Sequence, residues 1–307
     1  MTLIYTDPVF ARHEMPHGHP ERSERMAAVA QSLDDERLKS LPRRAPRAAP
    51  MEAVYRAHPK SYVDAILARR PEAGLVSLDP DTHMGPNSFD AALQASGAVM
   101  GAIDAVMAGE AKNAFVAARP PGHHAERTRA MGFCMINHIA IGARHAQAVH
   151  GLGRIAIVDF DVHHGNGTQD IFYEDDSVFY ASTHQWPLYP GTGAAAERGV
   201  GNIVNVPLGA GTDGRGYRPV FSNTIVRALK AFGPELVLLS AGFDAHADDP
   251  LASMMLVEDD FVWITREMMK VADEHAGGRL VSLLEGGYDL GALGRSTAAH
   301  LATLAGL

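Results

Sequence analysis

The stretch IAIVDFDVHHGNGTQD, residues 155–170, begins as an apolar run and continues with two carboxylates and two imidazoles. The opening run has no polar alternation, which indicates a strand of a parallel sheet that is covered on both faces. Side chains alternate along a strand, so Asp159, Asp161 and His163 are expected on one side of it. Burying such charges without partners costs on the order of several kcal/mol. The stretch therefore predicts a divalent metal ion at the end of this strand.

Other apolar runs share this character and alternate with amphipathic segments. The runs are NAFVAA at 113–118, SVFYAS at 177–182, ELVLLSAG at 235–242 and RLVSLLEGG at 279–287. The helical patterns lie at 88–109, 136–150, 215–232, 258–276 and 291–306. This rhythm predicts an α/β fold of three layers with a mostly parallel sheet. No linker or change of composition divides the chain, so we expect one domain over residues 1–307.

Long segments without a periodic pattern lie between these elements, at 71–87, 119–135, 183–202 and 241–257. Loops of such length in a compact domain usually have a function. Three of the four follow a predicted strand directly. They are therefore expected at the carboxyl edge of the sheet, where open α/β sheets bind their ligands.

The composition argues against several classes of protein. The chain has 27 basic and 36 acidic residues and a formal charge of −9, which disfavours a nucleic-acid binder. Cys134 is the only cysteine, so neither a disulfide within the chain nor a thiolate metal cluster can form. No run approaches the roughly 20 apolar residues that span a bilayer. We expect a cytoplasmic protein with no membrane partner.

Further polar residues follow the other predicted strands. Asp244 follows 235–242, the pair His123 and His124 follows 113–118, and Tyr288 follows the strand at 279–287. Any one of these could be a solvated strand end or a surface residue. Together they predict a single pocket, because the ends of parallel strands meet at one edge of the sheet.

The residue types suggest metal-assisted chemistry. Asp161, His163 and Asp244 would form an open three-ligand site that leaves room for water and substrate. Zinc is the first expectation, and Fe(II), Co(II) or Mn(II) would accept the same ligands. The two adjacent histidines suit proton transfer, and Tyr288 suits donation to a developing oxyanion.

Several motifs resemble the zinc-dependent histone deacetylase superfamily, in its class II-like bacterial branch, which includes acetylpolyamine amidohydrolases. The motifs are ARPPGHHA, GFCMINH, IVDFDVHHGNGTQD, YPGTG, SAGFDAHADDPL and EGGYDL, between residues 118 and 290, and HGHPERSERM at 17–26. The resemblance covers nearly the whole chain. It implies the arginase/deacetylase fold, with about eight strands in a mostly parallel sheet, and hydrolysis of an acylated amine.

The resemblance also implies roles for single residues. Asp161, His163 and Asp244 match the zinc ligands, and His124 matches the general base and acid. His123 matches an electrostatic companion that pairs with Asp159, while Asn166 is the expected partner of His124. The positions that match the lining of the substrate tunnel are Gly132, Phe133, Tyr189, Leu251 and Gly287.

Family members often bind potassium beside the zinc. The matching oxygens here belong to Asp159, Asp161, His163, Ser182 and Thr183. A second, more distant monovalent site would lie near Phe172, Asp175 and Val178. Both sites are expectations from the resemblance alone.

Two positions bear on activity and specificity. Tyr288 stands where some poorly active relatives carry histidine, which favours real deacetylation. Leu251 stands where polyamine-selective relatives carry a gatekeeper glutamate. We therefore expect acyl-lysine substrates first, with acetylpolyamines or other small amides as the alternative.

Three further functions stay open on the sequence, although each is less favoured. They are a non-catalytic binder of acylated amines, an esterase, and an arginase-like enzyme with two manganese ions. His138 is assigned no function, and the histidines at 58, 145, 150, 275 and 300 are expected as packing or surface residues. The sequence leaves the oligomeric state undetermined.

Overall fold

The central feature of the computed structural model, which describes residues 1–307, is an eight-stranded sheet. Its order is β2-β1-β5-β10-β9-β6-β7-β8, and every neighbouring pair is parallel. The strands are β1 Thr2–Tyr5, β2 Arg43–Arg44, β5 Asn113–Val116, β6 Ile155–Asp159, β7 Val178–Gln185, β8 Ile203–Leu208, β9 Leu236–Ala241 and β10 Leu280–Leu284. The predicted α/β class and the parallel sheet are confirmed.

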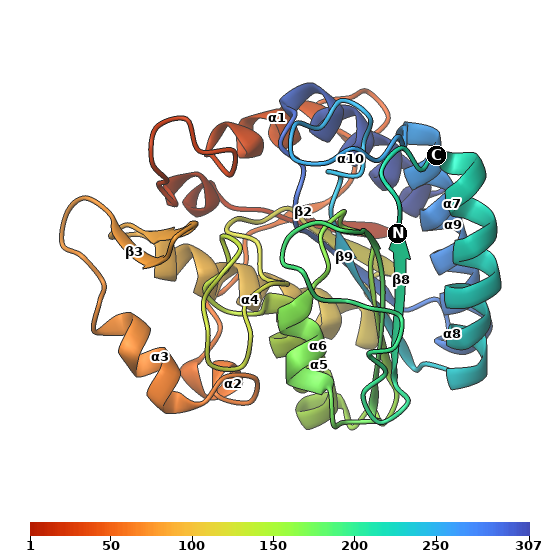
Figure 1. Ribbon diagram of the computed structural model, residues 1–307, viewed down its shortest axis with the longest axis horizontal. Coiled ribbons are helices and arrows are strands. Elements are labelled where there is room, and N and C mark those ends of the chain that lie inside the picture. Colours follow the sequence, from red (N-terminus) through yellow and green to blue (C-terminus); the bar gives the residue numbers. More distant parts are fainter.

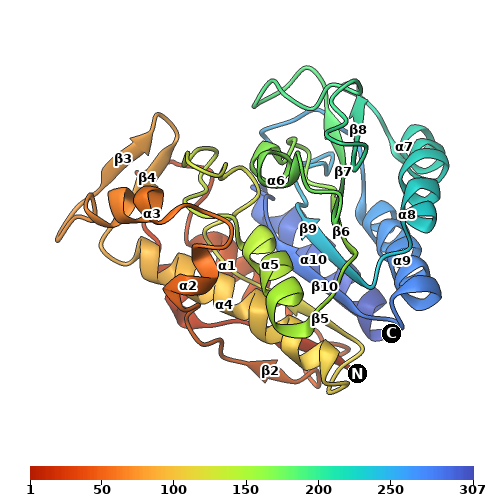
Figure 2. The same ribbon diagram turned by 90° about the horizontal axis from the view of Figure 1, so that it is seen from below.

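Helices cover both faces of the sheet (Figures 1 and 2). α4 (Ser88–Met107) and α5 (His138–His150) pack together on one face. α9 (Glu258–His275) and α10 (Leu290–Ala305) pack together on the other, and α1 (Glu24–Ser32) packs against α10. One connected core of 81 buried hydrophobic residues joins the layers. This core supports the assignment of residues 1–307 to one domain, which stays a prediction.

The predicted segment 215–232 consists of three helical pieces rather than one. They are α7 (Gly214–Val220), the π-helical turn η2 (Phe221–Val226) and α8 (Arg227–Phe232). Pro219 lies inside α7, where it has no backbone N–H to continue the regular helical ladder.

Short elements escaped the sequence analysis. They are β1, β2, β8, the hairpin of β3 (Val76–Asp79) and β4 (Thr82–Met84), the 3₁₀ helix η1 (Pro8–Arg12), α1, α2 (Met51–Val54), α3 (Lys60–Leu67) and α6 (Asn166–Phe172). The segment 71–87 was therefore wrongly expected to be irregular, and β7 extends into 183–202 as far as Gln185. Most of these elements are shorter than the window in which a period becomes visible. β8 contains Asn205 and Pro207, which break its apolar pattern.

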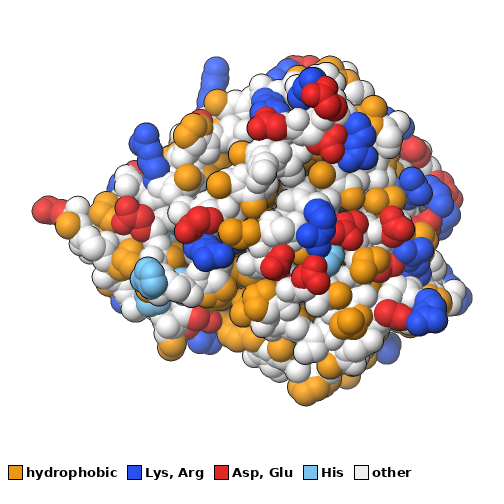
Figure 3. All heavy atoms as spheres, turned by 90° about the horizontal axis from the view of Figure 1, so that it is seen from above, with side chains coloured by type: hydrophobic (Ala, Val, Ile, Leu, Met, Phe, Trp, Pro, Cys, Tyr) orange, Lys and Arg blue, Asp and Glu red, His pale blue; other side chains and the backbone are white.

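The surface carries charges of both signs. On the face shown in Figure 3, lysine and arginine side chains are interspersed with aspartate and glutamate and form no continuous basic stripe. None of the helices combines the length and the apolar character needed to cross a bilayer.

Candidate active site

The three predicted metal ligands lie together just beyond the carboxyl ends of two adjacent strands. β6 ends at Asp159, so Asp161 and His163 belong to the following loop, and Asp244 follows the neighbouring strand β9. His163 Nδ1 lies 3.1 Å from Asp161 Oδ1 and 3.1 Å from Asp244 Oδ2. All three side chains are buried. The expected strand alternation does not reach Asp161 and His163, but the turn of the loop brings them to the same point.

The electrostatics of this cluster suit a cation. Burial, together with the nearby Asp161 carboxylate, raises the pKa of Asp244 to about 7. Burial also disfavours the ionised Asp161, but the His123 and His163 imidazoles outweigh it and keep the pKa of that carboxyl below its usual value. Two buried carboxylates so close together need positive charge beside them. Two oxygens and one imidazole nitrogen form a donor set that zinc and related divalent metals accept.

Glycine backbone forms one wall of this cluster. A Cβ atom at Gly242 would clash with the Asp161 carboxylate, and one at Gly286 would clash with both Asp161 and Asp244. The Gly286 N–H donates to Asp161 Oδ2 at 2.8 Å. These glycines therefore let backbone approach the carboxylates closely, a role that the sequence analysis did not assign to them.

The two adjacent histidines have different partners. His123 Nδ1 lies 2.9 Å from Asp159 Oδ2, whereas His124 Nδ1 lies 2.8 Å from Asn166 Oδ1. The Asn166 amide group donates to Glu126 Oε1 at 2.7 Å, which turns its carbonyl oxygen toward His124. His124 Nδ1 is therefore the donor of that pair, which leaves Nε2 as the basic nitrogen.

These surroundings shift the pKa values of the two imidazoles in opposite directions. Burial disfavours a charged His123, but the Asp159 and Asp161 carboxylates outweigh it and raise its pKa to about 10. Burial and the neighbouring imidazoles of His123 and His163 lower the pKa of His124 well below the ordinary value. At neutral pH the pair thus offers one cation and one neutral base.

A buried carboxylate holds the turn that carries both histidines. Glu285 Oε2 accepts hydrogen bonds from the backbone N–H of Gly122 at 2.7 Å and of His123 at 3.2 Å. Ser240 donates to the other oxygen at 3.1 Å. Burial raises the pKa of Glu285 to about 7. Glu285 belongs to the EGGYDL motif, but no pattern in the sequence indicates this role.

Tyr288 is 8% exposed and is held from two sides. Its backbone N–H donates to Asp249 Oδ2 at 2.7 Å, and the Arg25 guanidinium lies 5.0 Å from the centre of its ring. Arg25 donates to the carbonyl oxygens of Gly287 at 2.7 Å and Glu285 at 2.5 Å. Burial and the nearby Asp244 carboxylate raise the pKa of the phenol, so it stays protonated. Asp249 and Arg25 are further residues that the sequence analysis missed.

Three of the predicted tunnel residues, Gly132, Phe133 and Tyr189, lie beside His124 and Tyr288. The Phe133 ring lies 5.9 Å from the Tyr288 ring, and the Tyr189 ring lies 5.2 Å from the His124 ring. Phe133 is the only residue other than glycine with a positive φ, at 68°, and Gly132 before it has φ 57°. The backbone N–H groups of this turn donate to Asp81 Oδ1 and Thr82 Oγ1, each at 3.0 Å.

Two more predicted tunnel residues belong to the loops beside Tyr288. Leu251 is half-buried, and its backbone N–H donates to Asp249 Oδ1 at 3.0 Å. Gly287 has φ 126°, a conformation that side chains rarely adopt. A single carboxylate, Asp249, thus fixes both the Leu251 and the Tyr288 segments.

The first predicted potassium position is a cluster of buried oxygens behind the metal ligands. Asp159 pairs in register with Ser182, and Thr183 follows on the same strand. The Thr183 and Ser182 hydroxyls already bond Tyr217 at 2.6 Å and His184 at 2.9 Å. Main-chain oxygens would therefore have to supply much of any coordination there.

The carbonyl groups of the second predicted monovalent site converge on one point. Asn202 Nδ2 donates to the carbonyl oxygens of Phe172, Asp175 and Val178 at 2.9, 2.9 and 2.8 Å. A cation at that point would require the Asn202 side chain to move aside.

Three of the histidines that were given no catalytic role lie in the core. His58, His138 and His300 are fully buried. His138 bonds Ser96 at 2.8 Å, and His300 bonds Thr265 at 2.7 Å. These contacts explain their presence without a catalytic role.

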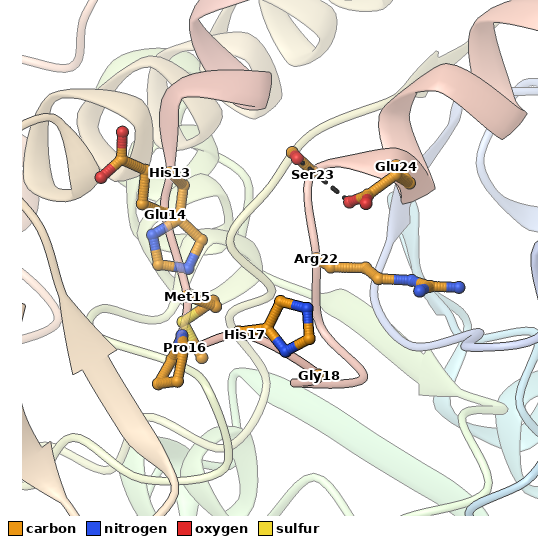
Figure 4. Close-up of a pocket in the computed structure, with 9 residues that line it drawn as sticks. All are labelled: His13, Glu14, Met15, Pro16, His17, Gly18, Arg22, Ser23 and Glu24. Carbon is orange, nitrogen blue, oxygen red and sulfur yellow. Dashed lines mark hydrogen bonds between the residues drawn. The ribbon is translucent and has the colours of Figure 1, made fainter.

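A separate cavity of about 340 Å³ lies in the N-terminal segment (Figure 4). Its lining comprises His13, Glu14, Met15, Pro16, His17, Gly18, Arg22, Ser23 and Glu24. None of these is a predicted site residue. The Ser23 hydroxyl bonds Glu24 at 3.1 Å, and His13 is buried against Ser88 at 2.8 Å. This cavity is distinct from the cluster at the strand ends.

Comparison with known proteins defines the class to which this fold and site belong. Residues 19–304 match the family model of the histone deacetylase domain. The crystal structure of the HDA15 HD domain has a TM-score of 0.94 and 34% identity, covering 99% of this chain and 88% of that one. The chain belongs to the histone deacetylase family, as the motifs predicted.

Individual relatives indicate the type of reaction. A probable deacetylase of Archaeoglobus fulgidus is 40% identical over 100% of this chain and 87% of its own. A histone deacetylase-like amidohydrolase of Pseudomonas aeruginosa is 42% identical over 88% of this chain and 73% of its own. The chain is accordingly a metal-dependent hydrolase that acts on amides of acylated amines.

Proposed function

We propose that this protein removes acetyl and related acyl groups from acetyl-lysine-type substrates, with zinc held by Asp161, His163 and Asp244. The observation that carries the proposal is a neutral imidazole, a protonated phenol and a buried three-ligand cluster gathered at one edge of the sheet. A protein that only bound acylated amines would need neither His124 nor Tyr288.

Each group has a separate role in the proposed reaction. Zinc, when bound, would polarise the amide carbonyl and make water a better nucleophile. His124 accepts a proton from the attacking water through Nε2 and passes a proton to the leaving amine. Tyr288 donates a hydrogen bond to the oxygen that gains charge as the carbonyl is attacked.

Neighbouring groups keep these residues in the correct state. The cationic His123, fixed by Asp159, disfavours protonation of His124 before the reaction begins. Asn166 fixes the His124 tautomer without adding a negative charge. Potassium at the oxygens around Asp159 would offset the charge of this carboxylate and is part of the proposal.

The tunnel residues support an extended acyl-amine substrate. Phe133 and Tyr189 would flank a methylene chain, while Gly132 and Gly287 leave the passage narrow but open. Leu251 offers no carboxylate for the distal ammonium of a polyamine, which favours acetyl-lysine over acetylpolyamine.

Single-substrate kinetics of the zinc-loaded protein test the proposal. An acetyl-lysine peptide is compared with N-acetylputrescine, N8-acetylspermidine and a simple ester, and Tyr288→Phe serves as the control for the chemical step. We expect the highest kcat/KM on the peptide. A higher kcat/KM on either acetylpolyamine would show that acetylpolyamines, and not acetyl-lysine, are the preferred substrates. A complete lack of acetate release from every amide would overturn the proposal.

A further inference from the structure

A second group of metal-ligating side chains lies outside the active site. Asp104 belongs to the last turn of α4, and His145 and His150 belong to α5. His145 Nε2 and His150 Nε2 lie 2.6 and 2.7 Å from the same oxygen, Asp104 Oδ1. The three ligand atoms all lie within 4.8 Å of one another. We propose that Asp104, His145 and His150 form a second site for a divalent cation of the zinc class.

The donor set is the first argument for a cation of this class. Two imidazole nitrogens and one carboxylate oxygen match the ligands that zinc, cobalt and nickel share. Zinc–ligand bonds of about 2.0–2.2 Å place neighbouring ligand atoms somewhat more than 3 Å apart. The two histidine nitrogens now lie 2.6 and 2.7 Å from Asp104 Oδ1, so only a small outward movement of these side chains would admit the ion.

The surroundings also favour a cation. Both helices end at this point, α4 at Met107 and α5 at His150, and the carboxyl end of a helix carries partial negative charge. The Asp104 carboxylate has ion-pair contacts with these two histidines and with no lysine or arginine. A metal ion would therefore displace no other cation.

Burial holds part of the site rigidly and leaves the rest accessible. The His145 side chain is 7% exposed, so packing fixes its ring, while Asp104 is 52% exposed. His150 is intermediate, at 21%. An ion could thus enter from solvent, and water could complete its coordination.

This site is separate from the catalytic cluster. α5 begins at His138, which contacts the Pro120 carbonyl of the catalytic turn at 3.1 Å. It ends 12 residues later at His150, which places the second site roughly 18 Å away along the helix axis. The ion would link the carboxyl ends of α4 and α5 and would take no part in the reaction.

Metal stoichiometry of tag-free protein tests the inference. Wild type and His150→Gln are equilibrated with buffered free zinc, and the bound metal is measured by mass spectrometry. We expect two equivalents in wild type and one in His150→Gln, with kcat/KM unchanged. One equivalent in wild type, or two in the variant, would overturn the proposal.

His275→Gln is the matched control. His275 is also the last residue of its helix, and its side chain is 23% exposed. It should keep two equivalents. In the background of Asp161→Ala, added zinc should raise the Tm, and the further change His150→Gln should abolish that rise. The absence of any rise in Asp161→Ala would contradict the proposal even if a variant folded poorly. The metal stoichiometry and the Tm depend neither on the substrate nor on catalysis.

Discussion

The two Asp–His clusters lie toward opposite ends of α5 and share carboxylate and imidazole donors in different proportions, but their surroundings differ. In the cluster of Asp161, His163 and Asp244 every side chain is buried, and glycine backbone forms one wall. In the cluster of Asp104, His145 and His150 the carboxylate is half exposed. The difference indicates that the surroundings of the donors, more than their chemical type, make the buried cluster the better candidate for a reactive centre. Burial and charged neighbours shift the pKa values of the first cluster and its adjacent histidines and so prepare that site for chemistry.

The largest expected effect separates the two clusters. Asp161→Ala should lose the catalytic metal and reduce kcat by roughly 10³-fold or more, because a bound metal contributes several kcal/mol to the transition state. Metal analysis and kinetics on the same preparation check this. Retention of normal activity would mean that the buried cluster is not the catalytic metal site.

Residues beside the buried cluster should affect chemistry without affecting metal content. His124→Ala and Tyr288→Phe should each reduce kcat by roughly 10²-fold or more, with bound zinc intact. Neither residue is among the proposed ligands. Loss of metal in either variant would show that ligands and proton-transfer groups have been confused.

Stability should depend on the carboxylate that holds the histidine turn. Glu285→Ala leaves the backbone N–H groups of Gly122 and His123 without their acceptor. Each buried unpaired group costs about 1–3 kcal/mol, so we expect a loss of about 3 kcal/mol in the free energy of unfolding. Denaturant titration measures it, and Glu285→Gln, which keeps an acceptor, should lose less. Equal losses in the two variants would contradict the role of the acceptor.

The amide partner of His124 predicts a change in pH dependence. Asn166→Asp places a carboxylate beside the imidazole, which favours its charged form and raises the pKa of His124. The base must be neutral to accept a proton, so activity should be lost at a higher pH than in wild type. The acidic limb of kcat/KM should move upward by about one pH unit or more. An unmoved limb would show that another group controls it.

The smallest effect is expected at the exposed cluster. His150→Gln should change kcat/KM by less than about twofold, because the side chain lies roughly 18 Å along α5 from the catalytic turn and surface substitutions usually change stability by no more than about 0.5 kcal/mol. The same kinetic assay, with His275→Gln beside it, measures the change. A large loss specific to His150→Gln would mean that this end of α5 communicates with the catalytic turn.

The sequence predicted the site residues whose own side chains would bind metal or substrate. Asp161, His163, Asp244 and Tyr288 were expected together because parallel strands end at one edge. The strands β5, β6, β7, β9 and β10 were expected because their runs are mostly apolar and carry no polar alternation.

Residues that act through backbone were missed. Glu285 and Asp249 hold N–H groups, and no local pattern signals such a contact. His145 and His150 are five residues apart, a spacing that does not place side chains on one face of a regular helix. They meet only because Asp104 of a different helix lies between them.

The left-handed backbone of Phe133 has a further consequence. A glycine at this position would adopt φ 68° without strain, so the fold alone would favour removing the ring. The ring nevertheless lies beside Tyr288. With the proposed role of Phe133 in the substrate passage, conformational stability and turnover would oppose each other at this position, and engineering for heat resistance there would be expected to sacrifice activity.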